Sequence, residues 1–227
     1  MITSQIIALI ALGICFVALG IHFVRLVKLG KPTEYSDKTG SVGKGVVYSN
    51  TTAMLPQNKE SAMHHLPTYG LGIIFHIGTF ISLLCFVLFF FPFFNHWIER
   101  FWLLNTILPL CLMLSAGCGF ALFIKRLISK DLKPLSTLDD YLSNLLTSLF
   151  QLFTALMFFC MQNGVAVDIY AIVVAYYAVA TLLFLYMPLG KLRHVVYFFA
   201  ARYHLGFFYG WRNVWPTKTM NNEHHSK

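Results

Sequence analysis

The chain has 227 residues, of which 57% are hydrophobic and only 11% are charged. Soluble domains carry about 25% charged residues, so this composition excludes an ordinary soluble protein and indicates a membrane protein. The formal net charge is +8, but 16 of the 17 Lys and Arg residues fall into three segments between apolar stretches. Such an asymmetry is typical of a membrane protein, so the positive charge requires no nucleic-acid partner.

Five apolar segments are long enough to cross a bilayer as helices. In chain order, the expected spans are Ile6 to Leu26, Tyr69 to Phe94, Trp102 to Ile124, Tyr141 to Phe159 and Ile169 to Leu189. Prolines inside or near the end of two spans are tolerated when neighbouring groups satisfy the freed carbonyls. The sequence therefore predicts an all-α integral membrane protein, a single membrane domain built as a bundle of five transmembrane helices.

The positive charges predict the orientation of the bundle. The three cation-rich segments are Arg25 to Lys59, Lys125 to Lys133, and Lys191 to the C-terminus, which leaves only Arg100 elsewhere. Because cations concentrate on the cytoplasmic side, we expect the N-terminus outside and the C-terminus in the cytoplasm. The glycine- and proline-containing segment 29–67 is expected to be a cytoplasmic loop without a domain of its own, and residues 195–227 a cytoplasmic tail.

The cysteines and carboxylates limit the possible chemistry. All five cysteines fall inside the expected spans or at their ends, and none forms a CxxC pair or another cluster. We therefore expect no iron–sulfur or zinc centre in this chain itself. The spans also lack the paired carboxylates that proton-driven transporters carry.

His76 and His194 are the most informative residues, because each lies in an apolar segment near the expected cytoplasmic face. His76 lies about 10 Å into the second span, and Gly72, four residues earlier, shares its helical face, where a flat macrocycle could lie against bare backbone. His194 follows the fifth span. Two neutral imidazoles at similar depth suit the iron of a haem. The alternative is structural: an interhelical hydrogen bond by His76 and an interfacial cation at His194.

From the second span onward, the chain resembles the cytochrome b (gamma) subunit of respiratory nitrate reductases and related heterodisulfide-reductase-like membrane complexes. Four segments carry the resemblance: Phe75 to Gly78, Phe123 to Leu127, Ser136 to Asp140, and Pro188 to His194. The resemblance implies a five-helix bundle in a prokaryotic cytoplasmic membrane that passes electrons between the quinone pool and a cytoplasmic iron–sulfur or flavin-containing subunit. It also implies that His76 and His194 are the ligands of the haem b nearer the cytoplasm.

The chain departs from the two-haem members of this family at two places. Where those members have two further histidines, this chain has Phe86 and Tyr176. Neither side chain replaces an imidazole in bis-histidine ligation, so we expect one haem rather than two.

The remaining candidates carry open alternatives. Lys125 and Arg126 are placed to meet haem propionates, although the positive-inside bias alone also puts cations there. His22, His64 and His65 are candidate partners of a quinone headgroup, although interfacial histidines are commonly only solvated. The alternative function is a haem-free membrane anchor or a small transporter whose histidines are structural.

Overall fold

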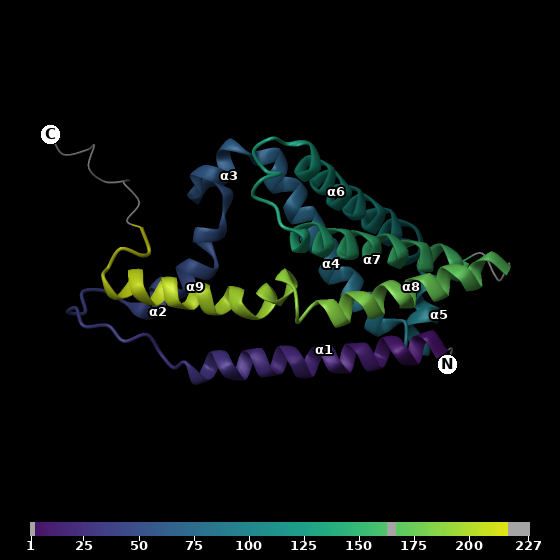
Figure 1. The fold of residues 1–227 in the computed structure, drawn as a ribbon, viewed down its shortest axis with the longest axis horizontal. Coiled ribbons are helices and arrows are strands. Elements are labelled where there is room, and N and C mark those ends of the chain that lie inside the picture. Colours follow the sequence, from purple (N-terminus) through teal and green to yellow (C-terminus); the bar gives the residue numbers. More distant parts are fainter. Residues whose placement is uncertain (1–2, 163–166, 218–227) are drawn as a thin grey trace. The chain divides into compact units, whose positions relative to one another are not determined.

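The computed structural model describes residues 3–162 and 167–217, and no strand occurs within them. Its longer helices are traced in Figure 1. They are α1 (Thr3–Lys28), α4 (Leu66–Leu88), α5 (Pro92–Arg100), α6 (Leu108–Ile128), α7 (Leu138–Gln162), α8 (Val167–Tyr186) and α9 (His194–Trp211), with α2 (Val42–Asn50) and α3 (Glu60–His64) between α1 and α4.

Among the described residues, four helical segments are long and apolar enough to cross a membrane. They are Thr3–Lys28, Leu66–Leu88, Leu103–Ile128 and Leu138–Met161, and a fifth is counted if Tyr170–Tyr186 and Lys191–Trp211 form one broken span. Large apolar side chains remain exposed along these helices, including Ile10, Phe16 and Val17 on α1. Exposed side chains of this kind suit contact with lipid. The expected all-α class is confirmed, and of the five expected spans four are matched by such helices, or five if the broken pair is one span.

The second and third expected spans are each altered near a proline. The second span was expected to run to Phe94, but α4 ends at Leu88 and Pro92 begins the separate helix α5. Proline suits the first turn of a helix, where no intrahelical N–H donor is needed. The third span begins with a π-helical segment, Leu103–Ile107, directly before Pro109. A wider turn there accommodates a residue that lacks an N–H and crowds the preceding carbonyls.

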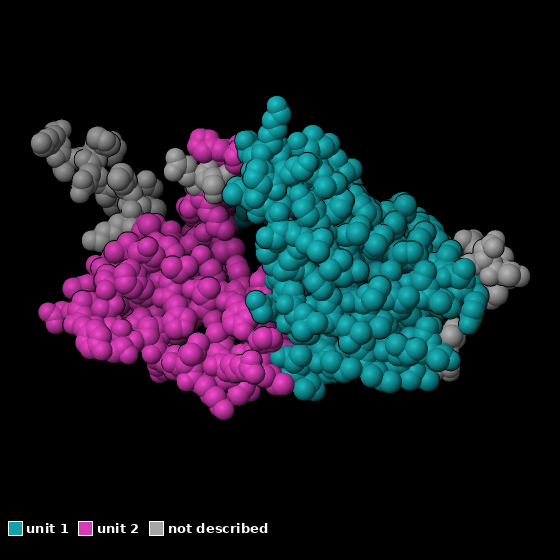
Figure 2. Space-filling view, viewed as in Figure 1, with its two compact units in different colours: residues 1–18, 67–193 teal, residues 19–66, 194–227 magenta. Residues whose placement is uncertain are grey.

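The chain divides into two compact units, coloured separately in Figure 2. The first unit comprises residues 1–18 and 67–193, and the second comprises residues 19–66 and 194–227. Helix α1 therefore contributes residues 3–18 to the first unit and residues 19–28 to the second. His76 belongs to the first unit, whereas His194 opens α9 in the second.

Small and polar side chains allow α4, α6 and α7 to approach closely in the first unit. Ser115 on α6 donates a 2.8 Å hydrogen bond to the carbonyl of Ile74 on α4. Gln151 on α7 is fully buried and donates to the Phe75 carbonyl at 3.0 Å and to Thr79 Oγ1 at 2.7 Å. A Cβ added at Gly78 would clash with the Ser115 side chain. Glycine and interhelical hydrogen bonds are how helices approach in an apolar solvent, where burial alone gives little drive.

The second unit is built around the packing of α2 against α9. Ser41 caps α2 by accepting from the Lys44 N–H. A Cβ at Gly206 would lie only 2.5 Å from the Cα of Val46, and one at Gly210 only 3.0 Å from the Cα of Gly45, so both contacts require glycine. The segment 29–67, which was expected to be a loop without a domain of its own, forms α2, α3 and two short 3-10 turns, Thr52–Met54 and Pro56–Asn58.

Candidate functional site

His76 is oriented by its own helix. Its Nδ1 lies 2.7 Å from the carbonyl oxygen of Gly72, one helical turn earlier. A carbonyl oxygen only accepts, so Nδ1 carries the proton and Nε2 is left with its lone pair in the neutral ring. The ring is exposed and makes an edge contact with Phe75 at 5.8 Å between centroids. This tautomer is the one in which Nε2 can bind a metal, and a backbone carbonyl is a common partner for the other nitrogen of a ligating histidine.

The surface beside His76 is open at its glycines. Cβ atoms added at Gly70 or Gly72 would meet nothing within 4 Å among the described residues. Because Gly72 lies four residues before His76, the open backbone is on the face of α4 that carries the imidazole. A flat, apolar group could therefore approach both the ring and the backbone of α4, which is the geometry expected for a haem at this site.

Lys125 lies at the end of α4 that precedes His76. Its Nζ donates a short hydrogen bond to Thr68 Oγ1. Thr68 is eight residues before His76, or about 12 Å along the helix. Lys125 thus ties the last turn of α6 to the first turn of α4, on the side where propionates of a haem held by His76 would be sought.

Arg126 belongs to a three-membered ion cluster. Asp140 accepts from Arg126 Nη1 at 3.1 Å and from Lys191 Nζ at 2.5 Å. The same carboxylate accepts from the backbone N–H and hydroxyl of Thr137, at 3.0 and 2.9 Å. A carboxylate held by two cations and two neutral donors fixes the end of α6, the start of α7 and the 3-10 turn Lys191–Arg193 to one another. Arg126 is therefore engaged by a carboxylate in this structure.

The cluster lies where the end of α6, the start of α7 and the chain after α8 meet. Tyr141 packs edge-on against Phe123 at 5.8 Å, and Tyr186 donates to the Asp139 carbonyl at 3.1 Å. Gly190 lies so close to this helix end that an added Cβ would stand 2.7 Å from Asp139 Oδ1. The chain leading to His194 is thereby anchored to the start of α7. Sequence reasoning did not single out Asp140, although Thr137 and Asp140 have the spacing of a helix-capping pair.

His194 is the first residue of α9 and is exposed. It follows a 3-10 turn, Lys191–Arg193, that connects the two units. Since His76 and His194 belong to different units, their pairing stays a prediction.

Phe86 and Tyr176 are both buried in the core of the first unit, with 1% and 0% of their surfaces exposed. Their ring centroids lie 6.1 Å apart. The surrounding cluster is almost wholly aromatic and includes Phe89, Phe150, Tyr177 and Phe184. Tyr176 stacks on Phe150 with an angle of 10° between the ring planes. Side chains therefore fill the space between these two positions.

The candidate quinone histidines all lie in the second unit. His22 Nδ1 lies 2.9 Å from the hydroxyl of Tyr197 on α9, and the two rings are in edge contact. His64 ends α3 and His65 follows it, and both are exposed. His22 therefore contacts α9, the helix that begins at His194, about one helical turn after that residue.

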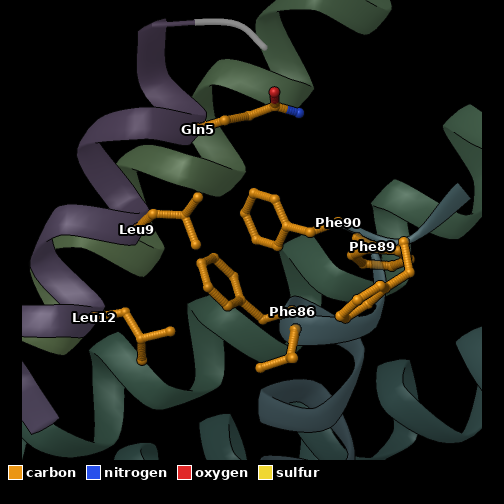
Figure 3. A pocket seen from close by; sticks show the side chains of 8 residues that line it. Gln5, Leu9, Leu12, Phe86, Phe89 and Phe90 are labelled. Carbon is orange, nitrogen blue, oxygen red and sulfur yellow. The ribbon is translucent and has the colours of Figure 1, made fainter.

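An apolar cavity of about 410 Å³ lies in the first unit between α1 and the end of α4. Figure 3 shows Leu9 and Leu12 of α1 facing Phe86 and Phe90 across it, with the Gln5 amide at one end. Gln5 donates to the Tyr177 hydroxyl at 3.2 Å. The cavity has the size and lining of a small-ligand site, and it lies toward the opposite end of α1 from His22.

Comparisons with protein-family models, with curated proteins and with solved structures find no match to this chain.

Proposed function

We propose that the protein is a haem b membrane subunit of a respiratory oxidoreductase complex, which exchanges electrons between the quinone pool and a cytoplasmic iron–sulfur or flavin-containing subunit. The observation that carries the proposal is the hydrogen bond from His76 Nδ1 to the Gly72 carbonyl. This bond holds the imidazole in the tautomer whose Nε2 is a ligand. Bound haem b would supply a one-electron carrier at this place.

The residues around His76 support this reading. The open backbone at Gly72 leaves room for a flat ring on the face of α4 that carries the imidazole. Lys125 offers a cation near the start of the same helix, where it would pair with a propionate. His194 is the proposed second ligand, supplied by the first turn of α9.

A single haem is proposed because the other ligand places of the resembling family are occupied by packed aromatic rings. Phe86 and Tyr176 lie 6.1 Å apart between centroids, within a buried cluster. A second macrocycle there would have to displace several fully buried side chains, each costing several kcal/mol if lost from the core.

The quinone and the partner subunit are assigned to the cytoplasmic side. In the proposed orientation the N-terminus is outside, and the structured segment 29–67 and the C-terminal region face the cytoplasm of a prokaryotic cell. These two parts make up most of the second unit and offer the docking surface for the partner. His22, His64 and His65 lie in that unit and are the proposed contacts of the quinone headgroup.

The test is the absorbance spectrum of the purified protein and of matched histidine variants. A reducible haem b band, at a haem-to-protein ratio near one, is expected for the wild type. His76→Ala and His194→Ala should each lose most of the haem, whereas the control His204→Ala, on the same helix as His194, should retain it. Full haem in both ligand variants contradicts the ligation, and a ratio near two contradicts the single site.

A haem-free membrane anchor is the second candidate function. Two residues expected to contact a cofactor already bind other protein groups, which favours this function: Lys125 bonds Thr68, and Arg126 pairs with Asp140. Under this reading His76 only stabilises its own helix. A purified complex that contains the partner subunit but no haem band would support the anchor.

A further inference from the structure

A second cavity, of about 320 Å³, lies wholly within the second unit, where α2, the turn before α3 and the end of α9 meet. Its polar lining includes Tyr48, Asn58, Lys59, Arg202 and Thr217, and Trp215 forms an aromatic wall. The volume is at the small end of the range for ligand sites. None of the residues proposed to contact haem or quinone lines this cavity.

Two cations share the cavity. Lys59 and Arg202 both line it, and no carboxylate is among the lining residues that the structure describes. Burial lowers the pKa of Lys59, and the positive charge of Arg202 lowers it further. Lys59 Nζ also donates to Met54 Sδ at 3.7 Å. An anion that enters between the two cations would gain a favourable interaction with each.

Arg202 is held in place by the protein itself. Its Nε donates to the Ser49 carbonyl at 2.8 Å, and its Nη2 donates to the same oxygen. In return, Ser49 Oγ donates to the Arg202 carbonyl at 2.7 Å. The guanidinium has five N–H donors, so further donors remain for a ligand. A cation fixed in this way loses little conformational entropy on binding, which favours a preformed anion site.

The neutral groups of the lining add further donors. The Tyr48 and Thr217 hydroxyls lie 2.9 Å apart, and one bond between two hydroxyls uses only one of their two hydrogens. The Trp215 ring packs against Tyr48 at 5.5 Å between centroids, and the Arg202 guanidinium lies 5.9 Å from its centroid. Hydroxyl, guanidinium and ammonium donors around one cavity suit the several acceptor oxygens of a phosphate better than a monatomic halide.

We propose that this cavity binds a phosphate group, with Lys59 and Arg202 as its charged ligands. The proposal is independent of haem and quinone. The phosphate could belong to an anionic lipid headgroup or to a small phosphorylated solute, and both present the same oxygens to the cavity.

The experiment uses the full chain in detergent and measures thermal unfolding by tryptophan fluorescence during titration with inorganic phosphate and with short-chain phosphatidylglycerol. Saturable stabilisation is expected for at least one probe. Lys59→Gln should weaken that binding about tenfold, which is typical of losing one charge-assisted contact. Lys59→Arg, which keeps the charge, should bind nearly normally.

Lys44→Gln is the matched control, because Lys44 is an exposed residue of α2 that does not line the cavity. It removes the same charge from the same unit and should bind both probes as the wild type does. A lipid source is indicated if phosphatidylglycerol binds much more tightly than inorganic phosphate, and a solute source if the order is reversed. The proposal is overturned if neither probe stabilises the wild type, or if Lys59→Gln and Lys44→Gln behave alike.

Discussion

Three glycines on α4 allow helix packing to be separated from cofactor binding, since each can be changed to alanine with a different expected result. At Gly70 and Gly72, an added Cβ meets nothing within 4 Å among the described residues. Alanine is favoured over glycine in a helix by up to about 1 kcal/mol. Gly70→Ala and Gly72→Ala should therefore leave the stability of the haem-free protein unchanged or raise it slightly.

Gly78→Ala should destabilise the fold. The added methyl would clash with the Ser115 side chain and lie 3.0 Å from Gln151 Oε1. Ser115 is 2% exposed and bonds the Ile74 carbonyl, so it has little freedom to move aside. Overpacking of this kind costs about 1–3 kcal/mol, which outweighs the gain in helix propensity. A loss of about 1–2 kcal/mol is expected, measured as a lower midpoint of thermal unfolding.

The same variants test on which face of α4 the proposed haem would lie. Gly72 shares the face of His76, whereas Gly70, six residues before His76, points elsewhere. A Cβ stands about 1.5 Å out from the backbone, enough to push a ring at contact distance away from the imidazole. Haem content should fall at least about tenfold in Gly72→Ala and stay normal in Gly70→Ala, read from the absorbance band per protein. Normal haem in Gly72→Ala would refute the placement of the macrocycle against this glycine.

Three further outcomes are expected from other parts of the chain. Asp140→Asn should lower the free energy of unfolding by about 1 kcal/mol, because a partly exposed network of two ion pairs loses its shared anion. Thermal unfolding measures this loss, and the control Asp131→Asn, in the exposed turn after α6, should have little effect. The hydrogen bond from Arg212 lowers the pKa of Glu34, so this contact should persist above the ordinary glutamate value of 4.5 and be lost as pH falls through the lowered pKa. Proteolysis of the segment before α2 should increase when the contact is lost, and Glu34→Gln should remove that pH dependence. A cysteine introduced at Ser41 should react with an impermeant reagent only after the cells are opened, and labelling of intact cells would reverse the proposed orientation.

The sequence predicted the parts of the fold that depend on hydropathy and failed where local backbone chemistry or tertiary contacts decide. The first span lies within α1, and the fourth within α7, because uninterrupted apolar runs leave little choice in a bilayer. The second span was expected to be longer than α4, since hydropathy continues past Leu88 while Pro92 starts a new helix. The helices within segment 29–67 were not predicted, and the close contact of Gly45 with Gly206 on a distant helix could not be read from the sequence.

In the candidate site, too, contacts within one helix could be predicted from the sequence, whereas contacts between helices could not. His76 and Gly72 could be paired from their spacing alone, since residues four apart share a helical face, and the structure adds the hydrogen bond between them. The pairing of Arg126 with Asp140 could not be read from the chain, because fourteen residues and a turn separate them. The sequence makes Arg126 a candidate propionate contact, with the positive-inside bias as the alternative explanation of its place. A residue engaged in this way can bind a propionate only by sharing or leaving its carboxylate partner, so Lys125 is the better candidate for that role.

The buried aromatic cluster bears on where a quinone would exchange electrons with a haem at His76. Phe86 lies ten residues beyond His76 on α4, or about 15 Å along the helix. It forms one wall of the cavity in Figure 3 and at the same time contacts Tyr176 and Phe184 in the core. A quinone in that cavity would be separated from the haem by at least this packed layer, with no imidazole in it to hold a second iron. A quinone beside His22 would instead meet the helix that begins with His194. If one haem is held at His76, no second haem relays electrons from this cavity, and the proposed quinone contacts His22, His64 and His65 do not line it.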